Sequence, residues 1–463
     1  MTAPAEIPPS SRVRAWALAR PALLIAACAI VPTILIDFIS RLFGSTLRPL
    51  LPPGIELTNL KNSRYIFELF KWPRDDSWWP MQKALATLHG PHAGTLYETL
   101  FFGEKVRFQY PPTSLLPINA LASVGLSSTQ ALNAINMAVF ALNAAAIGFF
   151  VWLLLSARPT NPQSPLAASL YNSRKSLSVL AACLPIIFYP LVRAGVLGQI
   201  QLWIDLFFTC SLILWVTDRR MASGLFAGLA CAIKPQLAIL FLWALLWRER
   251  KFAVGLLAGW IPFAVLSIGL YGLHNNIEYL NVLSFLGKRG ESFFDNNSIN
   301  GILNWYLSPD GSLWWENYKF APYNPIVYFG TLAAAVIFLG GILAVPLRTQ
   351  RPADVSDLGI AALCIAASSP IAWEHHYGIA LPLFFVALSQ IANSKSGAGP
   401  TKVLLLLWLS WILAANFISG IVLLDKTPFA ILQANTFMGV LILIGLLLGN
   451  APASTADRRI ASA

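Results

Sequence analysis

Ionisable side chains inside apolar runs, or at their edges, are the residues of this chain best suited to do chemistry. A charge in such surroundings is costly, so each of them is a candidate for a functional site. The candidates are two adjacent aspartates in a loop, a lysine within an apolar run, a Glu-His-His sequence that begins another run, and two isolated aspartates. These residues are Asp75, Asp76, Lys234, Glu374, His375, His376, Asp37 and Asp205.

The adjacent pair Asp75 and Asp76 offers carboxylates in a tryptophan-rich segment. A carboxylate near the membrane surface could take a proton from the hydroxyl of an acceptor. Aspartate is equally common as a cap at the start of a helix. The sequence therefore leaves the choice of a base open among Asp75, Asp76 and Asp37.

Lys234 interrupts the apolar run 221–247 in the sequence Lys-Pro-Gln. A lysine in such a run should face a polar cavity or an anion rather than lipid. A phosphate is a natural partner for its compact charge. Pairing with Asp205 on the preceding helix is the alternative, and the two arrangements are compatible.

The sequence Trp-Glu-His-His at 373–376 follows Ser-Ser-Pro and begins an apolar run. Histidine can shuttle protons or donate to a phosphate near neutral pH. Neighbouring residues of an α-helix point about 100° apart, so we expect only one of His375 and His376 to face a cavity. A satisfied pair at the membrane interface is the alternative. The HExxH spacing of a zinc site is absent, so we predict no metal.

Further candidates for substrate binding are amides, hydroxyls and basic groups in the loops. Tyr110 lies in a Gln-Tyr-Pro-Pro sequence and Gln199 follows a glycine. The loop 288–304 has the composition of a site for sugar hydroxyls, and also that of an ordinary polar loop. It contains Lys288, Arg289, Asp295, Asn296, Asn297, Ser298, Asn300 and Asn304.

The elements that must position these residues are membrane helices. The chain has 463 residues, of which 56% are hydrophobic and 11% charged, whereas soluble domains carry about 25% charged residues. The net charge of +11 comes mostly from short loops between apolar runs, where basic residues set orientation, so we expect no nucleic-acid partner. All five cysteines lie in apolar runs without CxxC spacing, which predicts neither disulfides nor a zinc site.

Eleven apolar runs predict an all-α polytopic membrane protein in one membrane domain, 1–463. The run 221–247 has basic residues on both sides and a proline in its middle, so we interpret it as two short helices that turn at Lys234-Pro235. This gives about twelve crossings. The runs are 21–43, 130–155, 177–194, 199–217, 221–247, 252–273, 323–346, 357–372, 374–392, 402–424 and 428–449.

Basic clusters predict that both termini are cytoplasmic and that the first run is a retained helix. The two long polar loops, 44–129 and 274–322, then fall on the periplasmic side. The first should contain amphipathic helices near 60–71 and 76–89 and a re-entrant or surface-lying segment at 111–128. In this topology one face of the membrane holds the candidates Asp76, Gln199, Lys234 and the 373–376 stretch. If 111–128 spans the membrane, this topology needs revision.

An ordered series of short motifs covers about residues 70–380. On this series the chain resembles glycosyltransferase family 87 of the GT-C superclass, which includes polyprenyl-phosphomannose-dependent mannosyltransferases. The motifs are Asp76-Ser77-Trp78-Trp79 to Gly90 with Tyr97 after it, Phe108-Gln109-Tyr110-Pro111-Pro112, Gly198-Gln199, Gly228 to Lys234-Pro235-Gln236, Asn297-Ser298-Ile299-Asn300-Gly301, and Ser369-Pro370-Ile371-Ala372-Trp373-Glu374-His375-His376.

The resemblance implies a GT-C-type fold with a large periplasmic first loop in a bacterial inner membrane. It implies an inverting transfer of a sugar, mannose in the named members, from a polyprenyl phosphate to a lipid or glycan acceptor at the periplasmic face, without a cofactor. Asp76 would be the general base, and His375, His376 and Lys234 would hold the donor phosphate. The remaining site residues would be Glu374, Gln199, Tyr110, Asn297, Asn300 and Arg289.

Two other functions share some of these features. A flippase or transporter of lipid-linked sugars predicts pseudo-symmetric halves and charges at the membrane midplane, and the sequence has no half-to-half repeat. A glycan ligase with a lipid-diphosphate donor predicts more arginines in the periplasmic loops, which Arg64, Arg74, Arg107 and Arg289 would satisfy.

Overall fold

The computed structural model describes residues 20–47, 61–71, 74–308, 311–313, 320–349, 351–394 and 400–450. In these segments the chain is helical, and its only β feature is an isolated bridge between Asn296 and Trp373. The predictions for the two terminal tails, and for parts of the loops 44–129 and 274–322, fall outside the described residues. The all-α prediction is confirmed for the described part.

Six helices are long and apolar enough to cross a membrane, which confirms a polytopic membrane protein. A seventh span results if α8 (Arg174–Cys183) and α9 (Tyr189–Leu197), which meet at 47°, count as one broken crossing. Four apolar helices have 13 to 16 residues, fewer than the roughly 20 of a full crossing: α10 (Gln201–Val216), α11 (Arg220–Ile233), α17 (Val355–Ala367) and α19 (Pro400–Ala415). Twelve crossings and a GT-C-type fold therefore stay predictions.

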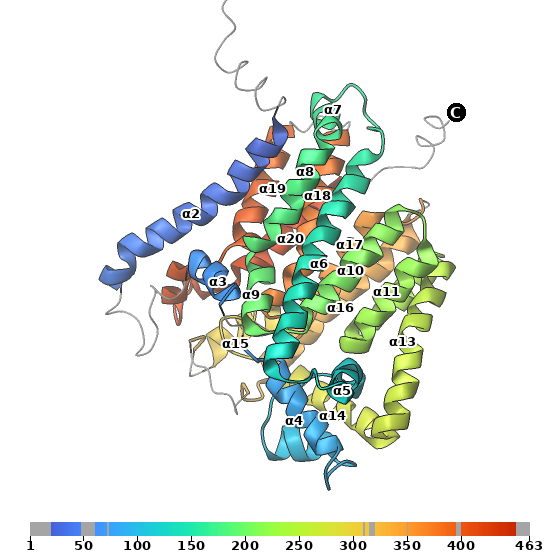
Figure 1. Ribbon diagram of the computed structural model, residues 1–463. Helices are drawn as coiled ribbons and strands as arrows, with labels where there is room; N and C mark the ends of the chain where they lie inside the picture. The colour runs from blue at the N-terminus through green and yellow to red at the C-terminus, as the bar shows by residue number, and fades with distance from the viewer. Residues whose placement is uncertain are drawn as a thin grey trace, which may run out of the picture.

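The helices that form the bundle follow the predicted apolar runs closely (Figure 1). They are α2 (Pro21–Leu47), α6 (Thr129–Ser156), α8 (Arg174–Cys183), α9 (Tyr189–Leu197), α10 (Gln201–Val216), α11 (Arg220–Ile233), α12 (Ile239–Leu246), α13 (Arg250–Tyr271), α16 (Pro325–Arg348), α17 (Val355–Ala367), α18 (Ala380–Asn393), α19 (Pro400–Ala415) and α20 (Asn435–Gly449).

The predicted reversal at Lys234-Pro235 is present between α11 and α12. Because proline cannot continue the ladder of helical hydrogen bonds, α11 ends at Ile233 and a 3-10 turn (Pro235–Ala238) leads into α12. The two outer ends of this hairpin meet, since Arg220 Nε lies 4.0 Å from a carboxylate oxygen of Glu249. Lys234 is thus at the tip of a helical hairpin.

Small residues let α11 pack closely against α13. Gly224 and Gly228 on α11 face Gly255 and Gly259 on α13, each pair spaced by four residues. A Cβ atom at any of these positions would run into a backbone carbonyl oxygen of the other helix. Glycine pairs at this spacing are a common way for membrane helices to approach each other, and here they fix the hairpin whose tip carries Lys234.

Short helices from the polar loops lie at both ends of the bundle. Figure 1 shows α4 (Trp78–Leu88), α5 (Leu116–Ser123) and α14 (Leu273–Arg289) at its lower end and α7 (Pro165–Asn172) at its upper end. The segment 111–128 contains only a 3-10 turn and the eight-residue α5, neither of which has the length of a crossing. These elements are α3 (Asn62–Leu69), α4 (Trp78–Leu88), a π-helix (Glu98–Gly103), α5 (Leu116–Ser123), α7 (Pro165–Asn172), α14 (Leu273–Arg289) and α15 (Ile299–Leu307).

Charged residues at the outer end of the hairpin form an ion pair and hydrogen bonds with one another. Arg351 donates to both carboxylate oxygens of Asp357, at 2.5 and 2.8 Å, and stacks over the ring of Trp247. Asp357 also accepts from the backbone N–H of Asp354 at the start of α17. These contacts tie the start of α17 to the end of α12, opposite Lys234.

Candidate active site

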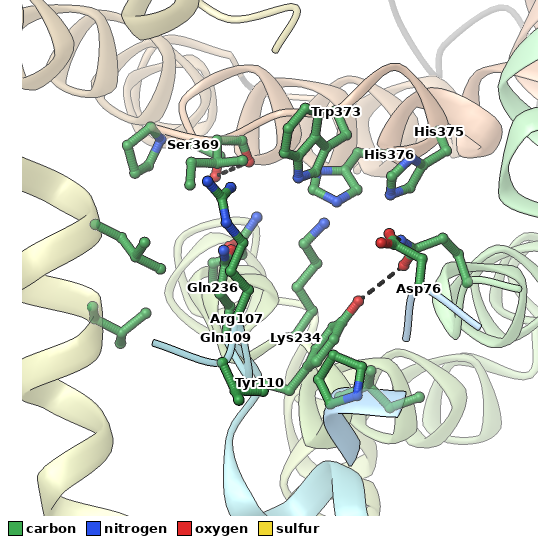
Figure 2. A pocket seen from close by; sticks show the side chains of 18 of the residues that line it. Asp76, Arg107, Gln109, Tyr110, Lys234, Gln236, Ser369, Trp373, His375 and His376 are labelled. Atoms are coloured by element: carbon green, nitrogen blue, oxygen red, sulfur yellow. Dashed lines mark hydrogen bonds between the residues drawn. The ribbon is translucent and has the colours of Figure 1, made fainter. Parts of the chain in front are cut away.

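A cavity of about 540 Å³ lies at the tip of the hairpin, between α11, α14 and the loops that carry the candidate residues (Figure 2). Segments that are up to 300 positions apart in the sequence contribute to it. Its lining includes Asp75, Asp76, Trp79, Lys105, Arg107, Gln109, Tyr110, Gln199, Lys234, Gln236, Tyr279, Ser369, Trp373, His375 and His376.

Asp76 is held by a network of neutral hydrogen-bonding groups. Gln199 donates its side-chain N–H to the Asp76 carboxylate. The Gln199 carbonyl oxygen accepts from Ser77 Oγ at 2.7 Å and from the Tyr110 hydroxyl at 3.0 Å. The Tyr97 hydroxyl donates to the backbone carbonyl of Tyr110 at 2.6 Å. The motif residues Asp76, Tyr110 and Gln199 are therefore one structural unit.

The Gly-Gln sequence before α10 fits this unit closely. Gly198 ends α9 in the left-handed conformation, at φ +66°, and a Cβ atom there would collide with the carbonyl oxygen of Arg74. The backbone N–H groups of Arg74 and Asp76 donate to the carbonyls at 196 and 197, at 2.8 and 3.0 Å. Only glycine meets both the backbone angle and the space, so the end of α9 fixes the position of the Asp76 loop.

The setting of Asp76 favours a carboxylate that can take up a proton. Its side chain is exposed to the cavity, and the surrounding protein replaces part of its water. That desolvation raises the pKa of the Asp76 carboxyl above its ordinary value, against the opposing effects of Arg193 and the Gln199 hydrogen bond. Burial likewise raises the pKa of Tyr110 to about 12, so its hydroxyl is neutral at physiological pH.

The three candidate bases have different surroundings. Asp37 accepts from the backbone N–H groups of Asn62 and Ser63, at 2.9 and 2.7 Å, at the start of α3. It is not among the residues that line the cavity. Asp75 borders the cavity with Asp76, and its backbone carbonyl accepts from Trp79. The geometry thus favours the adjacent pair over Asp37.

Lys234 directs its ammonium group into the cavity across from Asp76 (Figure 2). It donates to the amide oxygen of Gln201 at 3.3 Å. Gln201 in turn donates to Asp205 at 3.0 Å. The described residues show no direct ion pair between Lys234 and Asp205, because Gln201 lies between them. The amine of Lys234 is accordingly placed to bind an anion in the cavity.

The two adjacent histidines both border the cavity, which makes the expectation that only one would reach it wrong. The expectation assumed an α-helix, but residues Glu374–Ile379 form a 3-10 helix. The rings of His375 and His376 meet edge to face, with centroids 4.8 Å apart. They lie across from Lys234 and beside Trp373 (Figure 2).

Glu374 does not line the cavity but lies behind it, where it is 2% exposed. Its neighbour Arg193, which was not among the predicted site residues, donates to Asp295 at 2.8 Å and packs over the ring of Tyr65. Arg193 is a charge at the edge of the apolar run 177–194, so the rule that selected Lys234 would also have selected it. This buried group of charges is close enough to Asp76 to affect its pKa.

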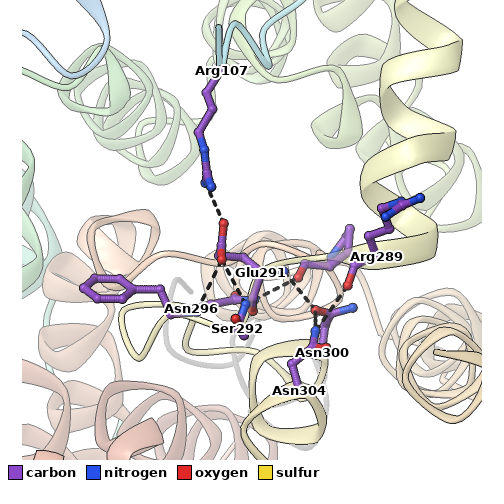
Figure 3. Close-up of polar contacts among 9 residues, drawn as sticks. Arg107, Arg289, Glu291, Ser292, Asn296, Asn300 and Asn304 are labelled. Atoms are coloured by element: carbon purple, nitrogen blue, oxygen red, sulfur yellow. Dashed lines mark hydrogen bonds and ion pairs between the residues drawn. The ribbon is translucent and has the colours of Figure 1, made fainter. Parts of the chain in front are cut away.

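Arg107, which the sequence placed only among the arginines of the periplasmic loops, also lines the cavity. Its guanidinium donates to Glu291 at 2.5 Å (Figure 3). The guanidinium also lies over the ring of Phe320. Burial raises the pKa of the Glu291 carboxyl, and Arg107 opposes that shift. Arg107 brings a fixed positive charge to the wall of the cavity.

Three residues predicted to bind substrate do not line this cavity. Asn297 is fully buried and donates to the backbone carbonyl of Phe294. Asn300 is also fully buried, where it bonds to Thr331 and Asn304. Figure 3 shows the side chain of Arg289 directed away from this amide cluster. The asparagines thus shape the 288–304 loop rather than meet a ligand in the cavity.

The residues that the structure describes contain no group of three or more His, Cys, Asp or Glu side chains arranged to hold a metal ion. The fold and the cavity define a polytopic membrane protein with a polar chamber at one end of its helices. The model of glycosyltransferase family 87 matches residues 108–370, more than half of the chain. The chain belongs to this family, and the resemblance found in the motifs is confirmed.

The chain is also similar to a curated relative. This relative is the polyprenol-phosphate-mannose-dependent alpha-(1-2)-phosphatidylinositol pentamannoside mannosyltransferase of Mycolicibacterium smegmatis. The two sequences are 26% identical over 230 residues, which is 49% of this chain and 52% of the relative. The chain thus spans about half the length of the relative that it matches.

Proposed function

We propose that this protein transfers a sugar, mannose in the simplest case, from a polyprenyl phosphate to a hydroxyl of a lipid or glycan acceptor. One observation carries the proposal: a carboxylate with a raised pKa and a group of cationic or proton-donating side chains border the same cavity. The carboxylate is Asp76, and the facing groups are Lys234, His375 and His376. The family and the named relative support the same class of reaction.

The reaction follows from these positions. Asp76 takes the proton of the acceptor hydroxyl while that oxygen attacks the anomeric carbon of the sugar. The bond from the anomeric carbon to the phosphate oxygen breaks, and the electron pair leaves with the lipid phosphate. Lys234 and the histidines stabilise the negative charge of the leaving phosphate. A single displacement of this kind inverts the configuration at the anomeric carbon.

Gln199 and Arg193 act on Asp76 without touching the substrate. Gln199 orients the carboxylate, and its hydrogen bond favours the charged form. Arg193 also favours the charged form through its positive charge. Desolvation opposes both and raises the pKa of the Asp76 carboxyl above its ordinary value, so the carboxylate gains basicity. This balance suits a general base.

The cavity is assigned to the periplasmic side of a bacterial inner membrane. The basic clusters around 218–220, 247–251 and 348–351 surround the outer ends of the hairpin, opposite the cavity. Basic loops favour the cytoplasm, which leaves the cavity on the other side. Cysteine labelling from outside the cell at Lys105→Cys, beside the cavity, should succeed, and labelling only after permeabilisation would contradict this orientation.

A reconstitution experiment tests the proposed reaction. The full chain in nanodiscs is supplied with polyprenyl-phosphomannose and a panel of glycolipid acceptors, and the mannosylated product is measured. Parallel samples receive polyprenyl-phosphoglucose or a polyprenyl-diphosphate sugar. Transfer from a monophosphate donor supports the proposal. Transfer only from the diphosphate donor would favour a ligase, and movement of the donor across liposome membranes without transfer would favour a flippase.

A further inference from the structure

A second cavity of about 500 Å³ lies on the other side of α14 from the candidate active site. One face of α14 contributes Tyr279, Leu283 and Leu286 to the active-site cavity. Another face of the same helix lines the second cavity, so α14 is a wall that the two cavities share. The second cavity is lined by Phe102, Asn281, Ser284, Phe285, Lys288, Arg289, Tyr323 and Tyr328.

The second cavity has a positive and hydrogen-bonding lining. Lys288 and Arg289 provide two cations, and Asn281 and Ser284 provide neutral donors two turns and one turn earlier on α14. Its lining contains no acidic side chain. Among the described residues neither Lys288 nor Arg289 forms an ion pair. The guanidinium of Arg289 is held over the ring of Phe285, 4.8 Å from its centroid, which fixes its place in the cavity.

The surroundings of this cavity are those of a membrane interface. It lies at the start of α16, a helix long and apolar enough to cross a membrane. Tyr323 and Tyr328 contact each other there, with ring centroids 6.2 Å apart, and tyrosine favours the level of lipid headgroups. The helices that line the cavity also expose large apolar side chains. On α16, Ile326 and Phe329 are each 62% exposed, and on α14, Leu280 is 60% exposed.

We propose that this second cavity binds the phosphate headgroup of an anionic lipid whose tails lie along the apolar faces of α14 and α16. Arginine and lysine together suit a phosphate, since the guanidinium can donate two parallel hydrogen bonds and the ammonium adds a point charge. The exposed apolar side chains beside the cavity suit acyl chains better than a soluble anion. The site does not depend on the transfer reaction proposed above.

The contacts between the two cavities suggest what the lipid does. The ring of Phe320 lies under Arg107 of the active site, 4.4 Å from its guanidinium carbon, and meets Phe285 at 5.4 Å. Phe285 in turn lies under Arg289. A continuous series of contacts between guanidinium groups and aromatic rings thus joins the lipid site to the active site. A lipid held there would lie one helix away from the reacting groups.

Lipid retention tests the inference without relying on transfer activity. The wild type, Lys288→Gln/Arg289→Gln and Ser284→Phe, which fills the cavity without removing charge, are purified and titrated with phosphatidylglycerol or phosphatidylcholine, with bound lipid counted by native mass spectrometry. We expect both variants to bind phosphatidylglycerol about tenfold more weakly and to bind phosphatidylcholine as the wild type does. A circular dichroism spectrum equal to that of the wild type confirms the fold.

The matched control is Arg250→Gln/Lys251→Gln, which removes an adjacent arginine and lysine, both exposed, from the far end of α13. It should retain phosphatidylglycerol like the wild type. Equal losses in this control and in Lys288→Gln/Arg289→Gln, or no loss in either cavity variant, would overturn the inference. Both results can be read even if the wild type shows no transfer.

A transfer assay then distinguishes two sources of the bound phosphate. If the lipid is the acceptor itself, Lys288→Gln/Arg289→Gln should raise KM for a phosphate-bearing acceptor and leave KM for a neutral glycolipid acceptor unchanged. If it is a lipid of the surrounding leaflet, KM for both acceptors should stay unchanged while phosphatidylglycerol binding weakens. Either pattern, together with weaker phosphatidylglycerol binding, supports the anionic-lipid site.

Discussion

Asp76 and Asp357 lie at opposite ends of the hairpin formed by α11 and α12, and their carboxylates have different kinds of hydrogen-bond partner. Asp357 accepts two hydrogen bonds from the guanidinium of Arg351 and one from a backbone N–H group. Among the described residues, the carboxylate of Asp76 accepts from the neutral amide of Gln199. One aspartate is neutralised by the protein, and the other keeps its capacity to accept a proton.

The basic side chains at the two ends of the hairpin differ in the same way as the two aspartates: one has a charged partner and the other a neutral one. Arg351 is paired with a carboxylate, whereas Lys234 donates a hydrogen bond to the neutral amide oxygen of Gln201 and interacts with Asp205 only through space. A buried charge pair holds helix ends together because breaking it leaves a charge without a partner. A charge in a cavity that has only neutral partners is ready for a charged ligand. The charges at one end of the hairpin thus stabilise the fold, and those at the other end are placed to bind a substrate.

The largest effect should come from Asp76→Asn, which keeps the shape and removes the basicity. We expect kcat for sugar transfer to fall by about 10²–10⁴-fold, the usual contribution of a general base. Asp75→Asn is the matched control, one residue away on the same cavity, and should stay within a few-fold of the wild type. Product formation in nanodiscs measures both. Strong loss in Asp75→Asn with near-normal Asp76→Asn would move the base to Asp75.

The next largest effect should come from Lys234→Gln, which removes the cation but keeps a polar group. Losing a hydrogen bond to a charged phosphate costs about 1.5–3 kcal/mol, which corresponds to roughly 10–150-fold in kcat/KM for the donor. We expect the loss in kcat/KM measured for the donor and no loss in kcat/KM measured for the acceptor. Lys251→Gln, at the opposite end, serves as the control. An unchanged kcat/KM in Lys234→Gln would mean that the donor phosphate binds elsewhere in the cavity.

A smaller effect, visible in the pH profile, should come from Gln199→Leu. Transfer requires the ionised form of Asp76, so the rate should rise with pH through the raised pKa of its carboxyl. The hydrogen bond from Gln199 lowers that pKa, and its removal should move the acid limb of the kcat profile to higher pH. We expect a loss of about tenfold at neutral pH. Gln390→Leu, on α18, is the control. An acid limb that stays in place would argue against Asp76 as the titrating base.

The smallest effect on transfer should come from Arg351→Gln, which removes a structural pair. The carboxylate of Asp357 would lose both guanidinium hydrogen bonds, at a cost of roughly 1–3 kcal/mol of unfolding free energy. Thermal unfolding in detergent should therefore shift to lower temperature while kcat stays unchanged at the assay temperature. A large fall in kcat without a change in unfolding would show that the two ends of the hairpin are functionally coupled.

Most of the helices could be predicted from the sequence because hydropathy and helix breaks are local properties. Lys234-Pro235 marks the reversal between α11 and α12, where proline lacks the N–H that a continued helix requires. The glycines of α11 and α13 are visible in the sequence as well, but their contact required both helices to be placed. The number of crossings stayed open because several helices are too short to be identified as spans by length alone.

The candidate site could be predicted in part. The cost of an intramembrane charge selected Lys234, and it could have selected Arg193. It could not separate Asp37, which caps α3, from Asp76 in the cavity. Nor could an amide-rich sequence show that Asn297 and Asn300 are buried inside their own loop.

The sequence by itself determined that this is a polytopic helical membrane protein of glycosyltransferase family 87, and which residue types could act on a phosphate-linked sugar. It could do so because the cost of burying a charge and the length of an apolar run are properties of each segment alone. Only the tertiary structure decided which of those residues share a cavity. Gln199 reaches Asp76 across 123 positions, and such a contact depends on how whole helices pack rather than on any local pattern.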